Sequence, residues 1–81
     1  MAITVLFFAS LAEAVGRREL SLAHVPGDTV ASVRERLVAV HPQIAEFTET
    51  LLYAVDEEYA EEDAPVPAGA TLALIPPVSG G

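Results

Sequence analysis

The C-terminal segment holds the residues whose types and order could carry chemistry. It reads Pro76-Pro77-Val78-Ser79-Gly80-Gly81. Two prolines fix an extended backbone that cannot fold back as a helix, so the last four residues would project as an arm of about 13 Å at full stretch. Because glycine lacks a Cβ, a narrow channel in another protein could enclose the backbone at Gly80 and Gly81. The reactive group of such an arm is the terminal carboxylate.

A carboxylate needs activation before it can transfer its acyl group. The acyl group is transferred only after a carboxylate oxygen has been converted into a better leaving group. No side chain of this protein need catalyse that step. The sequence contains no lysine, so only the amino terminus could act as an internal amine acceptor, which disfavours a modifier that polymerises on itself.

The remaining candidate residues form no catalytic or metal-binding pattern. Zero Cys excludes a thiolate nucleophile, a disulfide and a Cys-based zinc site. His24 and His41 stand apart without neighbouring ligands, so we expect surface or capping roles and no bound metal. The acidic residues between Asp56 and Asp63 lack the spacing and glycine of a calcium loop, which predicts a solvated loop.

Length and charge narrow the possible functions. The 81 residues fit one small domain, and a hydrophobic content of 52% allows a packed core. Twelve acidic residues against four basic ones give a net charge of −8, which disfavours nucleic acid and membrane surfaces as partners. Without a membrane-length apolar run or a basic N-terminal segment, a cytoplasmic location is expected. An acidic chain would dock most naturally on a basic protein surface.

The hydrophobic pattern predicts which elements hold this segment. Residues 3–8 read as a strand buried on both faces, residues 11–15 as a short helix capped by Ser10 and stopped by Gly16, and residues 17–23 as a second strand. Asp28 or Thr29 would cap the main helix, whose apolar stripe consists of Val30, Val33, Leu37 and Val40. A short turn within residues 42–50, a strand at 51–55, a very short strand near Tyr59 and a last strand at 71–75 follow.

This order describes an α+β roll in which one main helix crosses one face of a mixed sheet, as in a β-grasp. The predicted domain covers residues 1–75, and residues 76–81 form an extended, flexible tail. In this topology the first and last strands run parallel in the middle of the sheet. Leu6, Phe8, Leu72 and Leu74 share a parity that would place an apolar patch on the second face as a possible partner face. The alternative is that the short helix or residues 42–50 cover it.

The first strand V-L-F-F-A, the main helix and the ending P-P-V-S-G-G resemble the small subunits of molybdopterin synthase, which belong to the ubiquitin-like MoaD/ThiS sulfur carriers. The resemblance covers the whole chain. It implies that Gly81 is adenylated with ATP and Mg by a ubiquitin-activating-like enzyme and converted to a thiocarboxylate by a sulfur donor system. Residues 76–80 would form the tail that binds in the partner's channel. Gly81 would donate sulfur to cyclic pyranopterin monophosphate to form the dithiolene.

The resemblance also implies a heterotetramer with the large synthase subunit, no permanently bound cofactor and no side-chain active site. Three other functions fit a terminal Gly-Gly on this fold. The chain could carry sulfur for thiamine thiazole, cysteine or another thio-product; it could be a ubiquitin-like covalent modifier; or it could be a noncovalent binding module.

Overall fold

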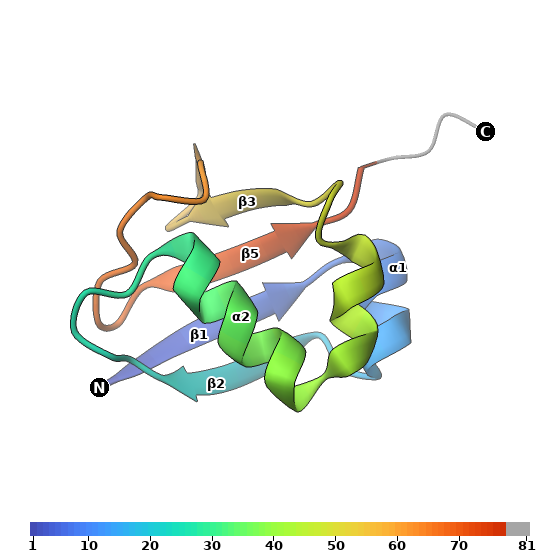
Figure 1. Cartoon of the computed structure of the whole chain (residues 1–81), viewed down its shortest axis with the longest axis horizontal. Coiled ribbons are helices and arrows are strands. Elements are labelled where there is room, and N and C mark those ends of the chain that lie inside the picture. Colours follow the sequence, from blue (N-terminus) through green and yellow to red (C-terminus); the bar gives the residue numbers. More distant parts are fainter. Residues whose placement is uncertain (78–81) are drawn as a thin grey trace.

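The strands of the computed structural model, which describes residues 1–77, form one five-stranded mixed sheet (Figure 1). In chain order the elements are β1 (Ala2–Phe7), α1 (Ala9–Val15), β2 (Glu19–Ala23), α2 (Val30–Val40), the 3₁₀ helix η1 (Pro42–Phe47), β3 (Leu52–Val55), β4 (Glu58–Ala60) and β5 (Thr71–Ile75).

The sheet order is β2-β1-β5-β3-β4, with β5 at the centre. β1 and β5 run parallel, and the other neighbouring strands pair antiparallel. With α2 crossing one face, this is the predicted β-grasp, including its parallel central pair. The parallel pairing brings the carboxyl ends of β1 and β5 to the same edge of the sheet, at the same end of the molecule as α1 (Figure 1).

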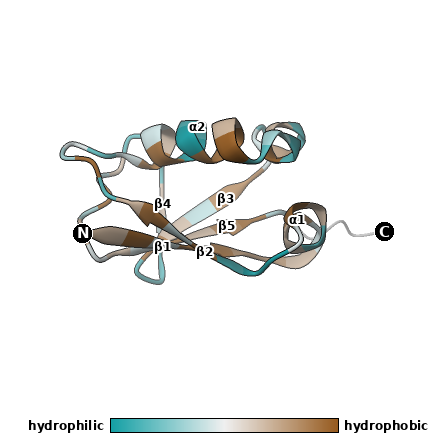
Figure 2. Cartoon of the chain, turned by 90° about the horizontal axis from the view of Figure 1, so that it is seen from below, coloured by the Kyte–Doolittle hydropathy of each residue, from teal (hydrophilic) through white to brown (hydrophobic). Residues whose placement is uncertain are grey.

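The core lies between the sheet and α2. Ile3, Val5 and Phe7 alternate along β1 and are almost fully buried, as expected when every second strand residue faces the core. Val30, Val33 and Leu37 of α2 cover them, and Figure 2 shows α2 lying across this single face. Val40 was predicted for the same stripe but is 59% exposed at the C-terminal end of α2, so the stripe ends at Leu37.

The start of α1 differs from the prediction, and its end agrees with it. Phe8 is the N-cap and Ser10 lies inside the helix, so the predicted Ser10 cap is wrong. The chain turns sharply out of β1 because Ala9 adopts a left-handed φ of 49°, and the helix starts at Ala9, two residues before the Leu11 start that a Ser10 cap would give. Gly16 ends α1 as predicted, with a φ of 85° and its N–H donated to the Ala12 carbonyl at 2.9 Å.

The start of α2 is held by a capping box. Thr29 Oγ1 accepts the Ser32 N–H at 3.2 Å, and Ser32 Oγ accepts the Thr29 N–H at 2.9 Å. Thr29 is therefore the N-cap that the sequence offered together with Asp28. Asp28 has a different role, because its buried carboxylate binds the side chains of Ser32 and Arg36.

Candidate functional site

The chain leaves the domain from the carboxyl edge of the central strand pair. Phe7 aligns with Leu74, and Leu52 pairs with Ile75, so the ends of β1 and β5 and the start of β3 meet there. Arg18, at the entrance to β2, accepts the Phe7 N–H with its carbonyl oxygen at 2.9 Å. We call the edge of the sheet at Phe7, Ile75 and Leu52 the exit edge. Because four strands and α1 are tied together here, the point from which the tail departs is fixed in the fold.

The described part of the tail consists of two prolines in different environments. Pro76 is buried directly after β5, whereas Pro77 is exposed. The first proline therefore packs on the domain and the second one leaves it. Val78, Ser79, Gly80 and Gly81, which the sequence predicts as the channel-binding and reactive residues, lie outside the described residues.

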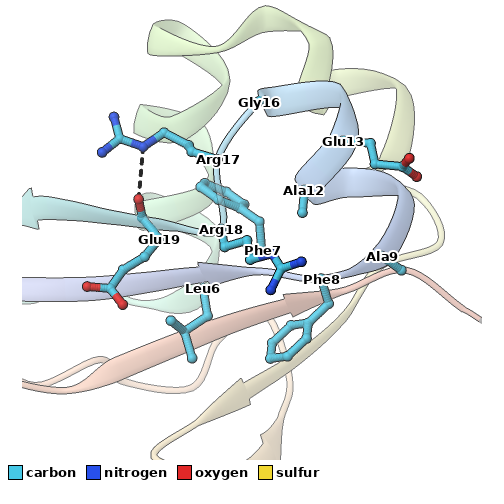
Figure 3. A pocket seen from close by; sticks show the side chains of 10 residues that line it. All are labelled: Leu6, Phe7, Phe8, Ala9, Ala12, Glu13, Gly16, Arg17, Arg18 and Glu19. Carbon is cyan, nitrogen blue, oxygen red and sulfur yellow. Dashed lines mark hydrogen bonds between the residues drawn. The ribbon is translucent and has the colours of Figure 1, made fainter.

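The second face of the sheet is the open face, and its apolar residues differ from those predicted. Leu6 is half-buried and Phe8 is 44% exposed, and Figure 3 shows both pointing to the same side. Leu72 and Leu74, predicted on the same patch, are fully buried, so this part of the prediction is wrong. The reason is the pairing register: Val5 aligns with Leu72 and Phe7 with Leu74, so the even-numbered residues of β5 face the core together with the odd-numbered residues of β1.

Other residues take the place of Leu72 and Leu74 on the open face. They are Ala73 and Ile75 of β5, Leu52 of β3 and Tyr59 of β4, all on the face opposite α2 by register. A shallow hollow of about 580 Å³ runs along this face from Phe8 to Tyr59. Its far end is acidic, because Asp56 and Glu57 line it at the edge opposite the exit edge.

Nothing within residues 1–77 covers the open face. η1, which falls within the segment offered as a cover, lies on the side of α2, where its Ile44 joins the same core cluster as Leu37. The short helix α1 inserts Leu11 into that core at the end of the sheet. In Figure 2, α2 lies on the other side of the sheet and α1 lies at its end, so neither α-helix of the described residues lies across the open face. The prediction that β1 is buried on both faces is therefore wrong, since no element of residues 1–77 covers the face on which Leu6 lies.

The described residues offer few groups for side-chain chemistry. Among residues 1–77, no group of three or more His, Cys, Asp or Glu side chains is placed to hold a metal ion. No described helix is long and apolar enough to cross a membrane. The acidic cluster of the β3–β4 hairpin has a structural role at Asp56, whose Oδ1 accepts the Thr71 N–H at 2.9 Å.

The most strongly perturbed charge lies away from the exit edge. The Asp28 carboxylate accepts hydrogen bonds from both Arg36 Nη atoms at 2.6 and 2.7 Å, from Ser32 Oγ at 2.7 Å and from the Val25 N–H at 2.9 Å. These donors, with Arg36 first, hold the pKa of Asp28 far below its usual value although burial opposes them. The same contact raises the pKa of Arg36. The network ties the loop before α2 to the helix, so it is part of the scaffold.

Asp28→Asn should destabilise the protein by about 2 kcal/mol at neutral pH, because Arg36 and the Val25 N–H lose a charged acceptor. The depressed pKa means that the wild-type stabilisation is complete above the unfolded pKa of about 3.9 and is lost as the pH falls from there toward the folded value. Urea unfolding should therefore show that the free energy of unfolding falls less between neutral and acidic pH in the variant than in the wild type. The matched control is Glu62→Gln, which removes the more exposed partner of Arg34 and should cost less than about 1 kcal/mol. Equal costs for the two variants would contradict this role of Asp28.

Sequence reasoning missed Leu52, Ala73 and Ile75 at the site. The sequence shows that residues alternate between two faces along each strand. It does not show which residues of neighbouring strands share a face, because that depends on the pairing register. One sequence signal for the exit edge is Arg18, which directly precedes β2 and continues the alternation of Leu20 and Leu22, where a cation is out of place.

The mixed sheet, its parallel central pair and the helix across one face define a ubiquitin-like β-grasp protein. Residues 5–81 match the ThiS family, and the chain belongs to that family. The molybdopterin synthase sulfur carrier subunit of Arabidopsis thaliana is 37% identical over 79 residues, which are 98% of this chain and 82% of that protein. The predicted resemblance to these sulfur carriers is therefore confirmed.

Solved structures agree on the fold. Small archaeal modifier protein 1 of Haloferax volcanii superposes with a TM-score of 0.89 at 29% identity, covering 100% of both chains. A chain of the complex between subunits 1 and 2 of the Helicobacter pylori molybdopterin-converting factor superposes with a TM-score of 0.71, also over 100% of both chains. At 18% identity, that second likeness concerns the fold alone.

Proposed function

We propose that this protein is the sulfur carrier subunit of a molybdopterin synthase and that the carboxyl group of Gly81 carries the sulfur. The observation that carries the proposal is the Pro-Pro-Val-Ser-Gly-Gly ending, which follows directly from the central strand of a ThiS-family β-grasp. The 37% identical relative is a subunit with this role.

The chemistry requires one substitution at the α-phosphorus of ATP and a second at the acyl carbon of Gly81. A carboxylate oxygen of Gly81 attacks the α-phosphorus of ATP, pyrophosphate leaves, and an acyl-adenylate forms in the activating enzyme, which supplies the Mg. A sulfide ion supplied by the sulfur donor system then attacks the acyl carbon, AMP leaves with the electrons of the broken C–O bond, and the chain ends in a thiocarboxylate. Inside the synthase, this sulfur displaces an oxygen substituent from a carbon of cyclic pyranopterin monophosphate, and water hydrolyses the resulting thioester so that Gly81 returns as a carboxylate. Two such transfers complete the dithiolene.

The structure suggests how a large subunit would bind. Leu6, Phe8 and Ile75 form an apolar surface without a cover within residues 1–77, and it adjoins the exit edge. A partner that takes the tail into a channel would bury this surface at the same time, and apolar burial would supply most of the affinity. The 37% identical relative is a subunit of molybdopterin synthase, which favours such a pairing, and a heterotetramer follows if the large subunit dimerises.

Intact mass spectrometry of the protein purified from its own cells tests the proposal. We expect a fraction in which one oxygen is replaced by one sulfur, with fragmentation placing the change at Gly81. We also expect this form to produce dithiolene when mixed with the large subunit and cyclic pyranopterin monophosphate. A sulfur-bearing chain that yields no dithiolene but supports thiazole or cysteine synthesis would make it a carrier for another pathway.

Covalent modification of other proteins is the second candidate function. It is favoured by the superposition on small archaeal modifier protein 1, which covers 100% of both chains. In that case the acyl-adenylate would be attacked by a lysine amine of a target, forming an isopeptide bond with release of AMP. Denaturing blots of cell extract would then show a ladder of conjugates that disappears when Gly81 is removed, and no sulfur-bearing chain would be needed.

A further inference from the structure

A second groove lies beside the exit edge and adjoins the hollow on the open face. It occupies about 670 Å³ where β1 ends, α1 begins and β2 starts (Figure 3). Leu6, Phe8 and Ala12 supply apolar lining, and Arg17 and Arg18 supply positive charge. Leu6 and Phe8 also line the open face, so the groove continues that surface around the edge of the sheet.

The groove holds the cations that the scaffold does not use. The chain has only four basic residues against twelve acidic ones. Arg34 pairs with Glu62 and Arg36 with Asp28, and both pairs fix α2 to its surroundings. Arg17 and Arg18 form no ion pair within residues 1–77, although Glu13 and Glu19 line the same groove. Both arginines are exposed, so their charge is available to a partner.

The two arginines are not equivalent. Arg17 donates from Nε to the Glu19 carbonyl at 2.9 Å, and its guanidinium points away from Phe8 in Figure 3. Arg18 extends the other way, toward Phe8 (Figure 3). Because the two groups diverge, they do not form one clamp for a phosphate. The arrangement suits a carboxylate that meets Arg18 while an adjacent apolar side chain rests on Leu6 and Phe8.

We infer that Arg18 is a specificity residue for the large subunit and that it pairs with an acidic residue next to an apolar one on that partner. The inference rests on the proposed function, because it takes the occupant of the groove to be the protein that receives the tail. Continuity with the open face and the exit edge favours this occupant, since a partner that covers Leu6 and Phe8 must pass over the groove. An acidic contact would also fix the orientation of a partner whose surface is otherwise attracted to the acidic remainder of the chain.

The test is isothermal titration calorimetry of the full chain with the purified large subunit from the same organism. We expect Arg18→Glu to weaken binding by about 10-fold or more, and this loss should shrink at high salt. Arg17→Glu changes the net charge by the same amount at the neighbouring position, to which we assign no contact, and should weaken binding by less than about threefold. Unchanged melting temperatures would show that both variants are folded.

A photo-crosslinking residue placed at Glu13, on the groove wall, tests the chemistry of the occupant. The captured peptide of the large subunit should contain Asp or Glu beside an apolar residue, and a captured peptide without an acidic residue would overturn the inference. Equal losses for the two arginine variants would show general charge steering and would also overturn it. If wild type binds tightly and Arg18→Glu does too, the inference fails and the proposed function stands. If wild type does not bind the large subunit, both fail.

Discussion

Deletion of Gly81 is expected to abolish dithiolene formation while leaving the domain folded. The deletion moves the terminal carboxylate back by about 3.5 Å along an extended chain, and misplacement of a reacting group by as little as about 1 Å can cost about 100-fold in rate. We therefore expect the rate of sulfur transfer to fall by at least about 100-fold. The measurement is single-turnover dithiolene formation with the large subunit, starting from thiocarboxylated protein prepared by chemical ligation so that activation is bypassed.

Two controls make the Gly81 result specific. Adding one residue after Gly81 should block transfer as well, because it pushes the reactive carbon past its position by the same distance. The melting temperature should not change in either variant, because the core ends at Leu74 and Pro76, well before the altered residue. A truncated chain that still forms dithiolene at the wild-type rate would exclude Gly81 as the sulfur-bearing residue.

The architecture was predictable because local and long-range signals agree. Each local signal favours one element: the apolar residues favour the strands β1 and β5, the apolar stripe favours α2, and Gly16 and Pro42 favour helix ends. The β-grasp is the arrangement that satisfies all of these preferences together. The role of the C-terminal segment was equally predictable, because it is identified from the types and order of its residues and needs no three-dimensional information. Its placement at an exit edge follows from the parallel pairing of β1 with β5.

The details of the site were not predictable in the same way, because each depends on a tertiary choice. Ser10 is a good capping residue, but the left-handed backbone at Ala9 starts α1 before it. Arg18 becomes part of a groove only because α1 folds over the end of β1. Leu72 and Leu74 were wrongly assigned to the partner face because alternation gives two possible faces for each strand. Only the register between Val5 and Leu72 shows which face of β5 lies on the core side.

Leu74→Ala and Ile75→Ala form a matched pair that tests this assignment of faces. Leu74 is fully buried at the centre of the sheet, and its truncation should leave a cavity and cost about 3 kcal/mol in the free energy of unfolding. Ile75 is half-buried on the open face, so Ile75→Ala should cost about 1 kcal/mol or less while weakening binding to the large subunit. Urea unfolding gives the first quantity, and calorimetric titration of the folded variants gives the second. If the two substitutions had equal effects on stability, the core and the docking surface would not lie on opposite faces of β5. The proposal that the open face binds the large subunit would then be contradicted.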